Sequence, residues 1–168
     1  MLGIIAAIWG FIGVFLFIGS AILKLAHFTL QINFETLELS QWMLMLAWIV
    51  FMAYYEGYKG FQKGFSPRVA ARIRYLTYNV TIKRLVFAPF FCLGFFDAER
   101  KRIIFIVCIT LGIVLIVKLV ENIPMPWRGM LDAGVVVGLA WGLISMVLFS
   151  IKAFLYKDFP HCAEVPKE

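Results

Sequence analysis

Residues 59–102 read KGFQKGFSPRVAARIRYLTYNVTIKRLVFAPFFCLGFFDAERKR, and the predicted fold depends on this stretch. It carries 10 of the 16 lysine and arginine residues of the chain. Apolar runs long enough to cross a lipid bilayer lie on both sides of it. Because lysine and arginine gather in the cytoplasmic segments of membrane proteins, the stretch predicts a polytopic membrane protein and its orientation.

The composition of the whole chain also indicates a membrane protein. Of its 168 residues, 62% are hydrophobic and 15% are charged, and the mean hydropathy is +0.89. A chain this short cannot bury so much apolar surface in its own core. We expect the net charge of +6 to serve membrane topology and contacts with anionic lipid headgroups. Nucleic-acid binding is a poor interpretation, because the basic residues lie close to predicted membrane segments.

Four apolar segments are predicted to span the membrane as helices, because about 20 residues cross a hydrocarbon core of about 30 Å. The first is interpreted as a retained signal anchor, since it lacks a basic start and a cleavage site. Both termini are expected in the cytoplasm, and the membrane is interpreted as a bacterial inner membrane. The predicted spans are residues 3–23, 39–58, 103–120 and 131–154, followed by a short tail at 157–168.

The central stretch divides into an amphipathic part and an apolar part. Ser66 and Pro67 are typical of a helix start, and the apolar residues in 69–80 recur on one helical face. This pattern predicts a basic amphipathic helix lying in the membrane interface. Residues 85–96 are apolar but too few to span, which favours a re-entrant or interfacial segment. The predicted fold is an all-α bundle of four transmembrane helices in one membrane domain, with residues 59–102 on its cytoplasmic face.

Five basic residues of the central stretch form the predicted binding surface for membrane lipids. Each would gain about 1 kcal/mol beside anionic headgroups. The function expected first is therefore a non-catalytic membrane protein that binds anionic lipid, a second copy of itself or another membrane protein. The five residues are Arg68, Arg72, Arg74, Lys83 and Arg84.

Glu56 is a candidate functional acid at the cytoplasmic end of the second predicted span. It lies among tyrosines, and acids near membrane spans are costly and often functional. The alternative interpretation is a structural role in which the carboxylate reaches the interface or forms an ion pair. The expected partner is Lys59, Arg68 or Arg72, because all three are predicted on the same side of the membrane.

The fourth predicted span contributes a second acid and a row of glycines. Asp132 stands four residues after Arg128 at the start of this span, where the helix dipole favours an acid. The pair is either a capped helix start or part of an outer ion- or substrate-binding cluster. Gly134, Gly138 and Gly142 lie close to one line along the helix, so they predict close packing of a neighbouring helix.

Two further functions stay open on the sequence alone. A homo-oligomeric channel or small transporter would use the glycine row for packing, although no predicted span holds an ionised residue near its middle. An enzyme acting on a lipid at the interface would use Glu56, Asp97 or Glu99, with arginines as a phosphate clamp.

No catalytic residue, metal site or cofactor is predicted. Cys92, Cys108 and Cys162 form no CxxC pair and no metal-ligand spacing. His27 and His161 are expected on opposite sides of the membrane, so they cannot hold one haem together. Zinc-hydrolase and nucleotide-binding motifs are absent from the sequence.

Overall fold

The computed structural model describes residues 1–156 and 159–165, and the regular structure in these residues is helical throughout. Three helices are long and apolar enough to cross a membrane. The prediction of an all-α membrane protein is confirmed to this extent. The three helices are α1 (Leu2–Leu30), α6 (Arg100–Val120) and α7 (Trp127–Leu155).

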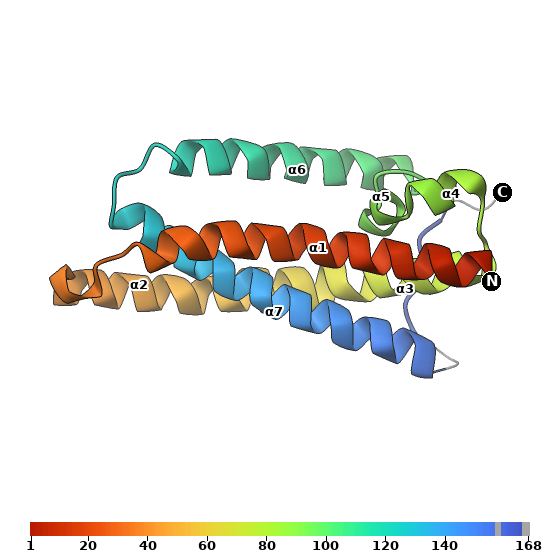
Figure 1. Ribbon diagram of the computed structural model, residues 1–168, viewed down its shortest axis with the longest axis horizontal. Coiled ribbons are helices and arrows are strands. Elements are labelled where there is room, and N and C mark those ends of the chain that lie inside the picture. The colour runs from red at the N-terminus through yellow and green to blue at the C-terminus, as the bar shows by residue number, and fades with distance from the viewer. Residues whose placement is uncertain (157–158, 166–168) are drawn as a thin grey trace.

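A further long helical rod consists of three consecutive pieces. α2 (Leu39–Met52) continues into the π-helix η2 (Ala53–Phe65), and η2 continues into α3 (Ser66–Tyr78). The residues at the two junctions keep α-helical angles, with φ −57° and ψ −40° at Ala53 and φ −59° and ψ −43° at Ser66. Figure 1 shows α2 and α3 aligned beside α1 and α7. Ser66 therefore lies within a continuous rod and does not begin a separate helix.

The direction of α3 differs from the interfacial helix that its sequence pattern suggested. The apolar face of α3 is buried in the main core, where Val69, Ile73 and Leu76 are at most 2% exposed. At the far end of α3, the carbonyl of Thr77 touches Gly3 so closely that a Cβ there would overlap it. An amphipathic pattern fits a protein core as well as a membrane surface, and here α3 packs along the bundle.

The apolar run at 85–96 forms parts of two short helices, α4 (Ile82–Val86) and α5 (Ala88–Leu93). They pack beside the N-terminal half of α1, and the Cys92 sulfur lies so close to Gly10 that a Cβ there would be only 2.8 Å away. α5 ends at Gly94, whose φ of +88° is the left-handed conformation that favours glycine. The run thus folds back on itself against α1.

α6 stands apart from the other long helices (Figure 1). None of its 21 residues is buried. The end of α6 that is predicted to face the cytoplasm begins near Arg102. This residue forms an ion pair of 3.6 Å with Glu164 of the tail. Lipid tails are as apolar as leucine, so an apolar helix does not need protein neighbours within a bilayer.

The three cysteines provide a test of this arrangement and of the predicted orientation. Cys92 is buried, and burial raises the pKa of its thiol to about 12, so the reactive thiolate is scarce. Cys108 is exposed on the apolar α6, where a bilayer excludes polar reagents, and Cys162 is exposed on the tail. A membrane-impermeant maleimide should therefore label only Cys162, and only in vesicles that expose the cytoplasmic face. Labelling of Cys162 in right-side-out vesicles would contradict the orientation, and labelling of Cys92 without denaturant would contradict its burial.

Candidate functional site

Arg72 joins three parts of the chain at the end of the bundle where α1 begins. Its side chain is almost fully buried, and its guanidinium lies 4.8 Å from the centre of the Phe91 ring. The carbonyls at the end of a helix have no partner within that helix, and Arg72 supplies donors to them. It therefore holds α5, the following loop and the tail against α3. The acceptors are the carbonyl oxygens of Phe91 (2.7 Å), Phe96 (3.3 Å), Asp97 (3.1 Å) and Glu164 (3.4 Å).

Arg84 also makes its main contacts within the chain. Its Nε donates to the Asp97 carboxylate over 2.8 Å, and its guanidinium lies over the ring of Tyr75 at 5.4 Å. Arg68 donates from Nε to the carbonyl of Gly64 at 2.6 Å. The structure thus places Arg68, Arg72 and Arg84, which were predicted to bind lipid, in contacts with the chain itself.

Arg74 and Lys83 lie nearer the surface. The Nη1 of Arg74 donates to the carbonyl of Tyr156 at 3.0 Å, which ties α3 to the end of α7. Lys83 on α4 is exposed and has no hydrogen bond or ion pair with the residues that the structure describes.

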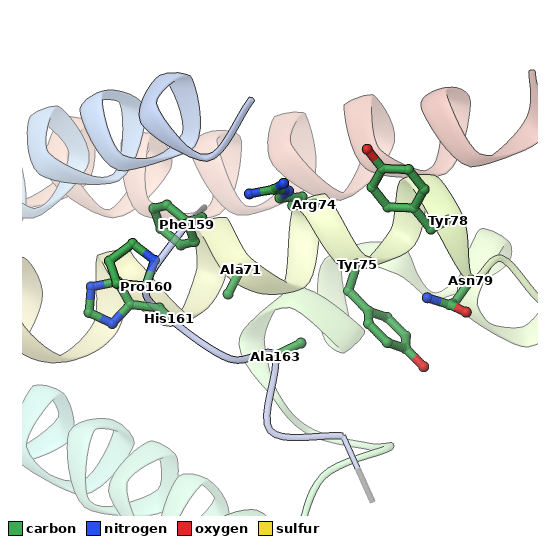
Figure 2. Close-up of a pocket in the computed structure, with 9 residues that line it drawn as sticks. All are labelled: Ala71, Arg74, Tyr75, Tyr78, Asn79, Phe159, Pro160, His161 and Ala163. Atoms are coloured by element: carbon green, nitrogen blue, oxygen red, sulfur yellow. The ribbon is translucent and has the colours of Figure 1, made fainter. Parts of the chain in front are cut away.

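A groove runs between α3 and residues 159–163 of the tail (Figure 2). Its volume is about 590 Å³. Arg74 and Tyr78 point to one side of α3, whereas Tyr75 and Asn79 point to the other (Figure 2). Polar groups from α3 therefore line both edges, and the tail adds an imidazole and apolar surface. The tail residues in the lining are Phe159, Pro160, His161 and Ala163, and Ala71 completes it. Residues 157–158 and 166–168 of the predicted tail lie outside the described residues.

The glycine row of α7 is covered by the rod that contains α2 and η2. A Cβ on Gly134 would lie 2.5 Å from the Trp48 ring, and a Cβ on Gly142 would overlap the Phe61 ring. Between them, a Cβ on Gly138 would lie 2.7 Å from Oε2 of Glu56. The three predicted packing glycines therefore contact a helix of the same chain.

Glu56 packs against the middle of α7. Gly138, its contact on α7, is near the middle of Trp127–Leu155. The expected partners also make other contacts: Lys59 lies over tyrosine rings, and Arg68 and Arg72 bind backbone carbonyls. The helix that carries Glu56 continues beyond the predicted end of the second span, through η2 into α3.

Asp132 lies inside α7 and is 4% exposed. Its Oδ2 lies 3.8 Å from the Nε of Arg128, within ion-pair range but too far for a hydrogen bond. Arg128 in turn lies 3.7 Å from the centre of the Phe28 ring on α1. The nearby acid Glu121 pairs with Lys118 at 2.9 Å. Asp132 and Arg128 thus link α7 to α1.

The acids proposed for a lipid enzyme lie in three different settings. Glu56 faces α7, Asp97 pairs with Arg84, and Glu99 lines a smaller cleft with Lys101. No group of three potential metal ligands occurs in residues 1–156 and 159–165. The geometry therefore does not assemble these acids into one site.

Sequence reasoning missed two polar contacts that join the α2–η2–α3 rod to α7. The hydroxyls of Ser66 and Ser145 lie 2.7 Å apart in the buried core, and the indole of Trp141 donates to Gln62 at 2.7 Å. Nothing in the sequence signals them, because each pair is separated by 79 residues.

Gly138→Val tests the seam between η2 and α7, which is the surface where Glu56 and Phe61 lie against Gly138 and Gly142. The added side chain has no space beside Glu56, and overpacking of this kind costs about 1–3 kcal/mol. The variant should therefore unfold at a lower temperature in detergent than the unchanged protein. Gly112→Val is the matched control, because a Cβ at Gly112 on α6 meets no atom within 4 Å. Equal unfolding temperatures for the two variants would contradict the described packing.

Arg72→Met tests the structural role of the buried guanidinium. Loss of its donors removes this partner from the part-buried carbonyls of Phe96, Asp97 and Glu164, whereas the Phe91 carbonyl keeps the N–H of Gly94, so we expect a cost of about 1–3 kcal/mol for each carbonyl left unsatisfied. Hydrogen exchange in residues 159–165 should become faster, because Glu164 loses its donor. Arg100→Met is the control, since Arg100 is exposed at the start of α6. Unchanged exchange in the tail of Arg72→Met would contradict the role described here.

The chain was also compared with known proteins. No protein-family model, curated protein or solved structure matches it.

Proposed function

We propose that this membrane protein is non-catalytic and binds the phosphate-bearing headgroup of an anionic lipid in the groove between α3 and residues 159–163. The observation that supports this proposal is the groove itself, which combines Arg74 with hydroxyl, amide and imidazole groups. This lining offers several hydrogen-bond donors and at least one positive charge. A phosphate group needs both.

The chemistry of the lining suits a lipid better than a free ion. A guanidinium presents a planar fork of donors that matches phosphate oxygens. The hydroxyl of Tyr78 lies one helical turn from Arg74 on the same side of α3, so both can address one headgroup. Phe159 and Ala71 add apolar surface to the groove, which suits the carbon atoms beside a lipid phosphate.

The surrounding charge supports an anionic ligand. The basic residues Lys83, Arg100 and Lys101 are exposed on α4 and at the start of α6, at the same end of the bundle as the groove. Anionic lipid surfaces attract such clusters. The connections at the opposite end, residues 31–38 and 121–126, hold acids and no lysine or arginine. We therefore place the groove and both termini on the cytoplasmic side of a bacterial inner membrane.

Lipid-dependent stabilisation tests the proposed binding site. Phosphatidylglycerol should raise the unfolding temperature of the detergent-solubilised protein more than phosphatidylcholine does, because only the first carries a net negative charge. Arg74→Gln should lose most of this difference, whereas Lys24→Gln, at an exposed residue near the opposite end of α1, should keep it. Native mass spectrometry should show the same order for retained lipid.

The lipid-free proteins provide the reference for this comparison. Arg74→Gln also loses its donor to Tyr156, so its unfolding temperature without lipid must be subtracted before the lipid effect is compared. Equal stabilisation by the two lipids, or an undiminished phosphatidylglycerol effect in Arg74→Gln, would refute the proposal.

A homo-oligomeric channel or small transporter is the second candidate. One observation favours it: Glu56 lies within the packed length of the helices and not at their ends. Acids in that position often belong to ion or proton pathways.

A further inference from the structure

Glu56 is an acid without a partner in the seam between η2 and α7. Its Oε2 is buried and accepts no hydrogen bond. Neither carboxylate oxygen forms a hydrogen bond or ion pair with the residues that the structure describes. The surface opposite it is Gly138, a residue with no side chain and no donor aimed at the carboxylate. The packing therefore buries one oxygen of a half-buried carboxyl group and leaves that oxygen unsatisfied.

The position of Glu56 along α7 is bracketed by two other contacts. Towards the start of α7, Thr29 of α1 lies 3.4 Å from the carbonyl of Gly129. Towards its end, Ser66 of α3 lies 2.7 Å from Ser145. Glu56 contacts Gly138, between these two levels. At those levels α1 and α7 are apolar enough to cross a membrane, so the carboxyl belongs to the part of the bundle that lipid would surround.

The charged groups on η2 itself have other contacts. The Nζ of Lys59 lies 5.2 Å and 5.0 Å from the ring centres of Tyr54 and Tyr55. The Nζ of Lys63 lies 4.7 Å from the ring centre of Tyr58. The lysines of η2 therefore lie over aromatic rings and do not pair with Glu56.

The elements packed against η2 are α2, α3 and α7, and none of them brings a cation to Glu56. α2 contains no charged residue. On α3, Arg68 binds the carbonyl of Gly64, and Arg72 and Arg74 bind carbonyls farther along. On α7, the charged residues are Arg128 and Asp132 near its start and Lys152 near its end.

These contacts decide which form of the carboxyl fits the seam. An ionised carboxylate away from water needs a cation or several donors, and the described residues supply neither. The protonated form needs much less compensation. π-helical turns are frequent at functional sites, and here such turns carry the acid. We propose that Glu56 is an intramembrane proton-binding site, protonated while it lies against Gly138 and ionised only when η2 separates from α7.

A lipophilic carbodiimide tests this inference in the full-length protein in its membrane. With dicyclohexylcarbodiimide, the carboxyl proton moves to one nitrogen of the reagent and the carboxylate oxygen adds to the central carbon. The resulting O-acylisourea rearranges to a stable N-acylurea, so the adduct keeps every atom of the reagent. Mass spectrometry of the peptides should find the adduct on Glu56, and its yield should fall as the pH rises, because the reaction consumes the proton.

A water-soluble carbodiimide and two variants complete the experiment. The water-soluble reagent should modify the exposed Glu99 and leave Glu56 unmodified. Glu56→Gln should lose the lipophilic adduct, and Glu99→Gln should keep it. The arms with the two reagents use the unchanged protein, so they decide the question even if a variant fails to fold. Absence of a lipophilic adduct on Glu56 at any pH, or equal modification by the water-soluble reagent, would overturn the inference. Neither result depends on lipid binding at the groove.

Discussion

The close contact between the α2–η2–α3 rod and the glycine row of α7 is the constraint on which the rest of the structure depends. Trp48, Glu56 and Phe61 each lie on one glycine of that row. Glycines allow two helix backbones to approach closely, which matters in a bilayer because apolar side chains gain little there by leaving lipid. α1 then packs against α3 and α7, and α5 packs against α1. The packing of α1 and α5 therefore depends on the contact between the rod and α7.

The π-helix explains how the rod keeps its contact with α7 over such a length. The residues that lie on the glycine row are Trp48, Met52 and Glu56 at steps of four, followed by Phe61 at a step of five. In a regular α-helix a further step of four residues would place Gly60, and not Phe61, beside Gly142. The wider turns of η2 advance the register by one residue, so a large ring fills the space beside Gly142. The same wide turns carry Glu56 into the seam.

The sequence predicted the features that depend on local composition. The apolar runs predicted α1, α6 and α7, because length and hydropathy suffice for a candidate span. The glycine spacing on α7 predicted a packing face, and the structure shows a helix there. The direction of α3 was not predictable, since it depends on contacts with residues that are distant in the sequence.

The candidate sites were harder to predict because their partners are distant in the sequence. Arg72 looks like any other basic residue of its stretch, and only the folded chain brings the carbonyls of α5 and the tail to it. The groove likewise needs α3 and the tail together. Glu56 was singled out as an acid at the end of a predicted span, but its contact with Gly138 depends on the continuation of the helix past it.

The isolation of α6 has a consequence for how the protein meets membranes of different thickness. A helix with no buried residue has no interlocking surface that resists a change of its tilt. Its two ends are held by short connections and by the Arg102–Glu164 ion pair, while most of its residues are exposed and its Ile106 lies against Gly94. In a thinner bilayer α6 can increase its tilt at a small cost in free energy. The rod and α7 must keep their crossing angle, because they pack closely at the glycine row. The chain thus combines a rigid bundle with one helix whose tilt can adjust to the thickness of the bilayer.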